Sequence, residues 1–198
     1  MGIEYEVKFH ATPEVQAAIG EAFAGQEQTF AMHTTYYDTP SGALSARYYT
    51  LRRREENGVP ICTLKTPADR GGRGEWETGC DCITDSIDIL CKLGAPKDLP
   101  YLAAEGLIPV CGAKFNRIAK TLIWENATLE LALDRGILYG GGTELPLCEV
   151  EVELKSGEPE VCLAFARMLK DRFSLEIEDK SKFRRALALY QGEHYGTV

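Results

Sequence analysis

Hydrophobic and polar residues alternate along much of this 198-residue chain. In residues 3–10 the alternation is strict, with Ile3, Tyr5, Val7 and Phe9 on one face and Glu4, Glu6, Lys8 and His10 on the other. A period of two residues is typical of a β-strand whose two faces meet different surroundings. Similar stretches, rich in β-branched and aromatic residues, predict further strands at 29–38, 48–55, 59–66, 73–80, 107–124, 127–134, 137–139 and 145–155.

Helix signals lie between and after these strands. Thr12-Pro13 is a favourable N-terminus for a helix that ends at Gly25, because Thr caps a helix well and Pro suits its first turn. Residues 84–106 have a helical texture that begins at Thr84-Asp85 and is broken at Pro100. Apolar residues at helical spacing predict two more helices, at 158–173 and 181–190.

The order of these elements predicts a single α+β domain over residues 1–198, built around one antiparallel sheet of about eight strands with flanking helices. Asn57-Gly58 predicts a two-residue hairpin turn between two of the strands. The run of glycines at 140–142 predicts a loop.

The polar faces of several strands carry like charges two residues apart, such as Arg52 with Arg54 and Glu75 with Glu77. A sheet with one face in water would also alternate in this way, and its charges would then be solvated. Each like-charged pair nevertheless repels by about 4 kcal/mol at about 4 Å in an effective dielectric near 20. A bound ligand of opposite charge would turn this repulsion into attraction, and the repetition over many strands favours that explanation.

Two ligands would satisfy these faces. A divalent cation would suit the carboxylates of Glu4, Glu6 and the 149–153 strand, and an all-oxygen donor set favours Mg²⁺ or Mn²⁺. A polyphosphate would suit a basic cradle made by Lys8, Arg52, Arg54 and Lys65. Together they predict a phosphoryl-transfer site of metal ions and cations.

Composition narrows the possible partners. The net charge of −8, from 22 basic and 30 acidic residues, argues against nucleic acid as a partner and leaves no polybasic segment for a membrane. We expect a cytoplasmic protein with reduced thiols, because no apolar run approaches about 20 residues, the first residues do not look like a signal peptide, and seven cysteines do not suit a disulfide framework. No phosphate-binding loop of the GxxxxGKS type is present.

A series of short motifs follows ExExK at Glu4 to Lys8 along nearly the whole chain. They are Tyr36-Tyr37-Asp38-Thr39, Leu51-Arg52-Arg53-Arg54, Thr63-Leu64-Lys65, Glu75-Trp76-Glu77, Phe115-Asn116-Arg117, the acidic strand from Glu130 to Asp134, the segment from Glu149 to Gly157, and Ser181-Lys182. ExExK is weak alone, but the whole series, in this order, resembles the CYTH superfamily, the triphosphate tunnel metalloenzymes.

The resemblance implies an eight-stranded, closed antiparallel β-barrel that forms a triphosphate tunnel, in which polar strand faces point inward onto a ligand. It implies metal ligation by Glu4, Glu6, Glu149, Glu151 and Glu153. Phosphates would be held by Lys8, Arg52, Arg54, Lys65, Arg117 and Lys182. Glu75, Glu77, Glu130 and Asp134 would line the tunnel and hold the basic side chains or an attacking water. Lys65, Glu6 and Tyr36 are the expected catalytic residues, with Tyr36 paired to Lys65 unless the adjacent Tyr37 takes that place.

One departure from the family concerns a phosphate contact. The family often has a basic residue at the position of Phe115, and Lys114 or Lys120 is the candidate substitute. Arg73 and Lys120 are otherwise expected at the surface, outside the site.

Three functions fit these residues. The leading hypothesis is metal-dependent hydrolysis of inorganic tripolyphosphate by a monomer or homodimer. The alternatives are an organic triphosphate enzyme, such as a thiamine triphosphatase or a class IV adenylyl cyclase, and a non-catalytic polyphosphate-binding module. An organic substrate would need an aromatic shelf, whereas the candidates are expected to pack in the core or barrel wall. These candidates are Tyr48, Tyr49, Trp76 and Trp124.

Overall fold

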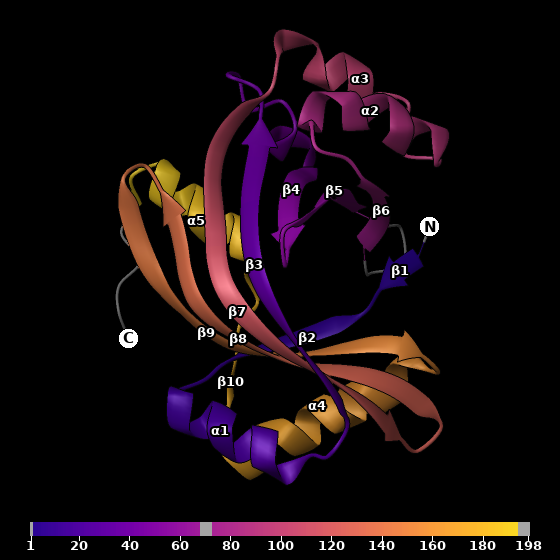
Figure 1. Cartoon of the computed structure of the whole chain (residues 1–198), viewed down its shortest axis with the longest axis vertical. Helices are drawn as coiled ribbons and strands as arrows, with labels where there is room; N and C mark the ends of the chain where they lie inside the picture. Colours follow the sequence, from indigo (N-terminus) through magenta and orange to yellow (C-terminus); the bar gives the residue numbers. More distant parts are fainter. Residues whose placement is uncertain (1, 68–72, 194–198) are drawn as a thin grey trace.

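The computed structural model describes residues 2–67 and 73–193, and within them the side chains from Tyr5 onward. Ten antiparallel strands form one sheet in the order β1-β6-β5-β4-β3-β7-β8-β9-β2-β10 (Figure 1). The strands are β1 (Gly2–Glu4), β2 (Glu6–His10), β3 (Gln26–Asp38), β4 (Thr50–Glu56), β5 (Val59–Pro67), β6 (Arg73–Gly79), β7 (Ile108–Trp124), β8 (Ala127–Gly140), β9 (Thr143–Ser156) and β10 (Glu176–Ile177).

The prediction of eight strands closed into a barrel was wrong. The hydrogen-bonded ladder is linear, with β1 at one edge and β10 at the other. The sheet is strongly curved (Figure 1), and its two ends are joined by the chain itself. β1 pairs with β6 and β2 pairs with β9, while only Tyr5 separates β1 from β2. The N-terminal segment therefore runs from one end of the curved sheet to the other.

The helices cover both faces of this sheet. They are α1 (Pro13–Ala22), α2 (Ile83–Lys92), α3 (Leu99–Leu102), α4 (Pro159–Phe173) and α5 (Lys182–Tyr190), with short 3-10 turns at Ser45–Arg47 and Ala103–Glu105. None of the helices in the described part of the chain is long and apolar enough to cross a membrane.

The period of two residues explains how the faces are divided. On the outer face, one apolar cluster packs α1 and α4 against β2, β8 and β9, and a second packs α2 and α3 against β4, β5 and β6. On the inner face, α5 packs Phe183, Ala186 and Leu189 against apolar residues of β3, β7, β8 and β9. Helix α5 thus covers one part of the inner face, and many charged residues of that face lie on the part that α5 leaves uncovered.

Several local expectations are confirmed. Thr12 caps α1 by accepting a hydrogen bond from the Val15 amide at 3.3 Å. Asn57 and Gly58 have φ angles of 50° and 85°, as a tight hairpin turn with two left-handed residues requires. Gly141 and Gly142 form the turn between β8 and β9, and both also have positive φ.

Other local expectations were wrong. Helix α2 begins at Ile83, after Cys82, so Thr84-Asp85 lies inside the helix and is not its cap. Pro100 lies in the first turn of α3, where its missing N–H does no harm, and it does not break a helix. The segments 127–134 and 137–139 belong to a single strand, β8, and the short strand β10 was not predicted.

Asp38, at the end of β3, holds the following loop. Its buried carboxylate accepts hydrogen bonds from the backbone amides of Thr39, Leu44 and Ser45, at 2.8, 2.9 and 3.0 Å. The aspartate of the YxDT-like segment is therefore a structural residue that fixes the entry to β4.

We predict that Asp38→Ala lowers the free energy of unfolding by about 2–4 kcal/mol, because three backbone donors lose a charged acceptor. Urea unfolding at neutral pH measures this, with Asp81→Ala as the control at an exposed aspartate. Equal effects of the two substitutions would contradict the structural role of Asp38.

Candidate functional site: a charged cavity inside the curved sheet

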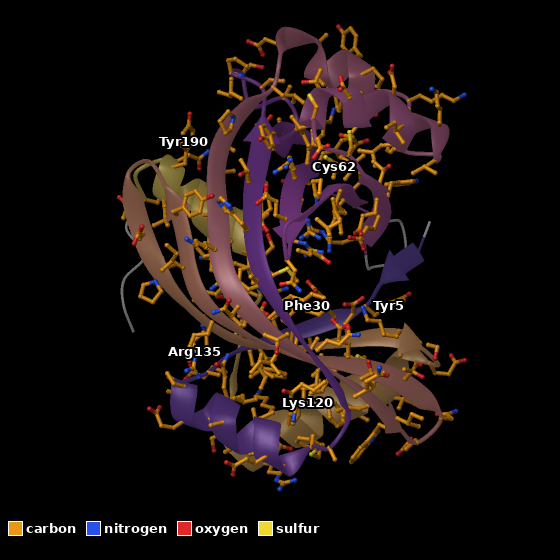
Figure 2. The ribbon with its side chains drawn as sticks, in the orientation of Figure 1. Tyr5, Phe30, Cys62, Lys120, Arg135 and Tyr190 are labelled. Carbon is orange, nitrogen blue, oxygen red and sulfur yellow. The ribbon has the colours of Figure 1, made fainter. Side chains whose placement is uncertain are left out.

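A cavity of about 290 Å³ opens on the inner face of the sheet, and residues of eight strands, β2 to β9, and of the start of α5 line it. Side chains bearing nitrogen and oxygen gather in this interior, and the labelled Phe30 lies beside it (Figure 2). Most of the lining is charged, with eight basic residues and seven glutamates. The basic residues are Lys8, Arg52, Arg54, Lys65, Arg73, Arg117, Lys155 and Lys182, of which Lys155 is exposed to solvent.

One wall of the cavity is basic and is carried by β4 and β5. Arg52 and Arg54 project inward two residues apart, and Lys65 lies on the neighbouring strand, opposite Thr50. Lys65 lies 3.4 Å and Arg52 3.9 Å from the carboxylate of Glu75 on β6. Arg52, Arg54 and Lys65 thus lie close together, and Arg52 and Lys65 share the carboxylate of Glu75.

Arg54 is the cation with the least favourable surroundings. Burial and the adjacent guanidinium of Arg52 lower the pKa of Arg54 to about 10, although Glu56 forms an ion pair with it. Its Nε is buried and has no hydrogen-bond partner among the described residues. A buried cation beside a second cation is stabilised by an anion, so this wall suits a polyanion.

The other wall is acidic and is carried by β8, β9 and β2. Glu130, Glu153 and Glu6 lie directly opposite one another on these three neighbouring strands and line the cavity. We call this set the glutamate row. Lys8 lies 3.0 Å from Glu6, and Lys155 lies 3.0 Å from Glu153 and 3.5 Å from Glu130.

A second acidic group lies at the floor of the cavity, under α5, where Glu151 lines the cavity and the fully buried Asp134 and Glu149 do not. Asp134, Glu149 and Glu151 each offer a carboxylate oxygen, and these oxygens all lie within 4.8 Å of one another. The ammonium of Lys182 contacts all three, at 2.8, 2.7 and 2.7 Å. We call these residues, together with Arg117 and Arg185, the deep ion cluster.

Arg117 and Arg185 complete the deep ion cluster. Arg117 binds both oxygens of Asp134 at 2.7 Å and also contacts Glu151. Arg185 pairs with Glu149 and lies 3.3 Å from Glu178, which in turn lies 3.0 Å from the ring of His10. Three carboxylates thus meet three cations, and the six charges balance.

The pKa values of the cluster follow from this balance. Burial would raise the pKa of Glu151, but Lys182 and Arg117 outweigh it and hold the pKa well below its usual range. Burial would lower the pKa of Lys182, but Asp134, Glu151 and Glu149 raise it well above its usual range. Glu151 and Lys182 are therefore both charged at neutral pH.

The two acidic groups differ in their fitness for a metal ion. In the deep ion cluster the position between the three carboxylates is filled by the Lys182 ammonium, so a metal ion would have to displace a buried lysine. In the glutamate row Lys8 contacts Glu6, Lys155 contacts Glu130 and Glu153, and Arg117, which is shared with the deep ion cluster, lies 3.9 Å from Glu130. Among the ion pairs of the described residues, no buried ammonium fills a position between all three of these carboxylates. The row offers oxygen donors only, which suit a hard divalent cation.

Comparison with known proteins agrees with this geometry. The family model described as CYTH domain matches residues 2–187 of the chain. The chain belongs to the CYTH domain family.

A curated relative of the CYTH domain is an inorganic triphosphatase of Haemophilus influenzae, 26% identical over 192 residues. The alignment covers 94% of this chain but 54% of the relative, so the chain spans about half the length of the curated protein.

Solved structures share the fold. One is a candidate adenylyl cyclase from Hippeastrum, described as having a dominant triphosphatase activity, with a TM-score of 0.69, 18% identity and coverage of 98% of both chains. Another, from Pyrococcus horikoshii OT3, has a TM-score of 0.62 and 21% identity, and covers 95% of this chain and 99% of that one. A third, a candidate adenylate cyclase from Bacillus halodurans, has a TM-score of 0.63 and 17% identity over 92% of this chain and 96% of that one.

Most of the residues that the sequence suggested for the site lie together in the CYTH domain. Two of them do not line the cavity: Asp134 and Glu149 lie in the deep ion cluster. The side chain of Glu4 lies outside the described residues. The cavity lining contains Glu6, Lys8, Tyr36, Arg52, Arg54, Lys65, Glu75, Glu77, Arg117, Glu130, Glu151, Glu153 and Lys182.

Tyr36 is the tyrosine that faces the cavity, and Tyr37 packs on the opposite face against the cluster under α2. Tyr36 lies opposite Arg52 on β4, with its ring 5.1 Å from that of Phe183. The expected neighbour Lys65 lies one strand further, opposite Thr50. The register thus places Tyr36 beside Arg52, and its pairing with Lys65 stays a prediction.

The expectations for the remaining cations were wrong. Neither Lys114 nor Lys120 takes the place of a basic residue at 115, because Lys114 is exposed on the outer face and Lys120 donates to the carbonyls of Gly20 and Phe23 near α1 (Figure 2). Phe115 instead lies beneath the cationic groups of Arg117 and Lys182, at 5.8 and 5.3 Å. Arg73, expected at the surface, lines the cavity.

Two charged residues that contact these carboxylates, Arg185 and Lys155, were missed in the sequence, although each carried a signal. Arg185 follows Lys182 by three residues, so both lie on the same side of α5. Lys155 follows Glu153 by two residues on β9 and therefore faces the same side of the sheet.

We predict that Lys182→Met lowers the free energy of unfolding at pH 7 by about 3–5 kcal/mol, because three buried carboxylates lose their common cation. The pH dependence should also change. In the wild type the low pKa of Glu151 stabilises the fold fully above its unfolded pKa of about 4.3, and this stability is lost as pH falls toward the lower folded pKa.

In Lys182→Met this acid-dependent loss should shrink, since the pKa of Glu151 is no longer held down as strongly. Urea unfolding at pH 7 and at several values below 5 measures both effects, with the exposed Lys92→Met as control. An unchanged pH dependence would argue against the deep ion cluster.

Proposed function

We propose that the chain is a metal-dependent phosphohydrolase that converts inorganic tripolyphosphate to pyrophosphate and phosphate. The observation that carries the proposal is the pairing, in one cavity, of a basic wall with a glutamate row on other strands. A linear polyanion and a divalent cation are the ligands that this combination suits best.

The basic wall provides the phosphate contacts in this proposal. Arg52 and Arg54 present planar guanidinium groups, which can bind phosphate oxygens in pairs, and Lys65 adds a point charge on the next strand. Lys8 and Arg117 are further cations at the cavity surface. Arg117 already forms ion pairs with Asp134 and Glu151. It would therefore attract a phosphate through its positive charge at the cavity floor and would not bind the phosphate oxygens directly.

The glutamate row would hold Mg²⁺ or Mn²⁺ through Glu6, Glu130 and Glu153. A divalent ion there would neutralise charge on the phosphoryl oxygens and make a bound water more acidic. The deep ion cluster has a structural role in this proposal and binds no metal ion, because its carboxylates are already neutralised by Lys182, Arg117 and Arg185.

The hydrolytic step follows from these positions. A water oxygen forms a bond to the terminal phosphorus, the bond from that phosphorus to the bridging oxygen breaks, and the leaving pyrophosphate keeps the electron pair. Glu6 would accept the proton of the water, and Arg52 and Lys65 would stabilise the negative charge on the leaving group. Burial raises the pKa of Tyr36, so its hydroxyl would remain a neutral hydrogen-bond donor beside Arg52.

We predict fast phosphate release from tripolyphosphate with Mg²⁺ or Mn²⁺, and none with EDTA. Lys65→Ala and Glu6→Gln should each lower kcat/KM by about 10²-fold or more, because each removes a charge that stabilises the transition state. Phosphate release from tripolyphosphate, ATP and thiamine triphosphate, assayed in parallel, checks this. Lys97→Ala, at an exposed lysine of the α2–α3 segment, is the matched control.

Tight polyphosphate binding without turnover of any substrate would contradict the proposal and make the chain a binding module. Cyclic AMP from ATP, or preference for thiamine triphosphate, would keep the site and change the substrate.

An organic triphosphate is a second candidate, because part of the cavity is apolar. Phe30 and Met32 on β3 and Phe115 on β7 line it next to the charged walls. The aromatic residues considered in the sequence do not line it: Tyr48 is exposed, and Tyr49, Trp76 and Trp124 pack in the outer clusters.

Phe30→Ala separates the two candidates. If an organic group stacks on this apolar strip, kcat/KM for its triphosphate should fall about tenfold, since a stacked aromatic contact is worth about 1–3 kcal/mol. With inorganic tripolyphosphate as the substrate, the kcat/KM of Phe30→Ala should remain within about twofold of the wild type. Steady-state kinetics on tripolyphosphate and ATP measures both values.

A further inference from the structure

Two lysines that each contact more than one carboxylate, Lys182 and Lys155, are held very differently. Lys182 contacts three carboxylates, and only 10% of its side chain is exposed. Lys155 contacts two members of the glutamate row, Glu153 at 3.0 Å and Glu130 at 3.5 Å, and 41% of its side chain is exposed.

The position of Lys155 has a clear electrostatic cause. Glu130, Glu153 and Glu6 lie in directly opposite positions on three adjacent strands, where strands are about 4.8 Å apart. Like charges at that spacing repel, so the row requires a cation. Lys8 forms an ion pair with Glu6 at one end of the row, and Lys155 forms ion pairs with the other two carboxylates, Glu130 and Glu153.

The ammonium of Lys155 therefore lies where a divalent cation would bind. Its flexible stem leaves from the end of β9 at the rim of the cavity, so the ammonium can leave toward solvent without disturbing the sheet. Lys182 has no comparable freedom, because α5 and the apolar cluster around Phe183 fix its backbone.

We propose that Lys155 is a displaceable counter-ion of the glutamate row. It neutralises Glu130 and Glu153 when no metal ion is bound, and a divalent cation must displace it to bind. Lys155 thereby weakens metal affinity and stabilises the metal-free fold. This inference rests on the proposed metal site in the glutamate row.

Binding of Mn²⁺ alone, without substrate, tests this in the full chain by calorimetric titration. Lys155→Met should lower the Kd for Mn²⁺ about tenfold, because the ion no longer competes with an ammonium. In EDTA the melting temperature of this variant should be lower than that of the wild type, and saturating Mn²⁺ should remove the difference. Lys155→Arg keeps the positive charge and should bind Mn²⁺ no more tightly than the wild type.

Two further variants make the result specific. Lys114→Met removes an exposed charge of the outer face and should leave the Kd within about twofold of the wild type, since distant surface charges are screened. Glu153→Gln should weaken Mn²⁺ binding. If Lys155→Met leaves the Kd unchanged while Glu153→Gln weakens binding, the counter-ion role is wrong and the proposed metal site stands. If neither the wild type nor any variant binds Mn²⁺, the metal site and the counter-ion role are both wrong.

Discussion

The contact of the Lys182 ammonium with Asp134, Glu149 and Glu151 joins the C-terminal helix to the inner face of the sheet. A buried carboxylate is unfavourable without a partner, and here three of them lie within 4.8 Å of one another. Helix α5 therefore brings more than apolar packing to the inner face. It delivers the cations that allow β8 and β9 to carry acidic residues there. Gln16 of α1 supports the same strands from outside by donating to the carbonyls of Asp134 and Glu149.

Charge compensation also explains why the cavity is divided. The deep ion cluster is balanced by the protein alone, so it needs no ligand and suits a structural role. The basic wall and the glutamate row are only partly compensated, as the lowered pKa of Arg54 and the solvent-exposed Lys155 indicate. Incomplete compensation keeps these side chains ready to exchange their protein partners for a ligand, and it places that exchange at the more open part of the cavity.

Much of this arrangement could be predicted from local signals. The period of two residues assigned the inward faces of β2, β4, β5, β6 and β9, and Asn57-Gly58 defined the hairpin between β4 and β5. The predictions that were wrong concern residues whose surroundings are set by contacts with segments distant in the sequence. Glu149 has the same spacing as Glu151 and Glu153, and only the position of α5 decides that it pairs with Arg185 and does not line the cavity. Lys120 appeared to be a surface residue because the carbonyls that it binds, at Gly20 and Phe23 in the last turn and C-cap of α1, are about a hundred residues away. The open ladder could not be read from strand patterns either, because it depends on the break at Tyr5, which sends β1 and β2 to different ends of the sheet.

That break has a consequence for how the chain is made. β1 and β2 are synthesised before their partners, which lie at opposite ends of the sheet. β1 pairs with β6, and β2 pairs with β9, whose residues follow about 140 positions later. Contacts between such distant segments form slowly, because the entropy of closing a long loop is lost before any pairing compensates for it. During translation β2 must therefore wait for its partner β9 until most of the domain has emerged.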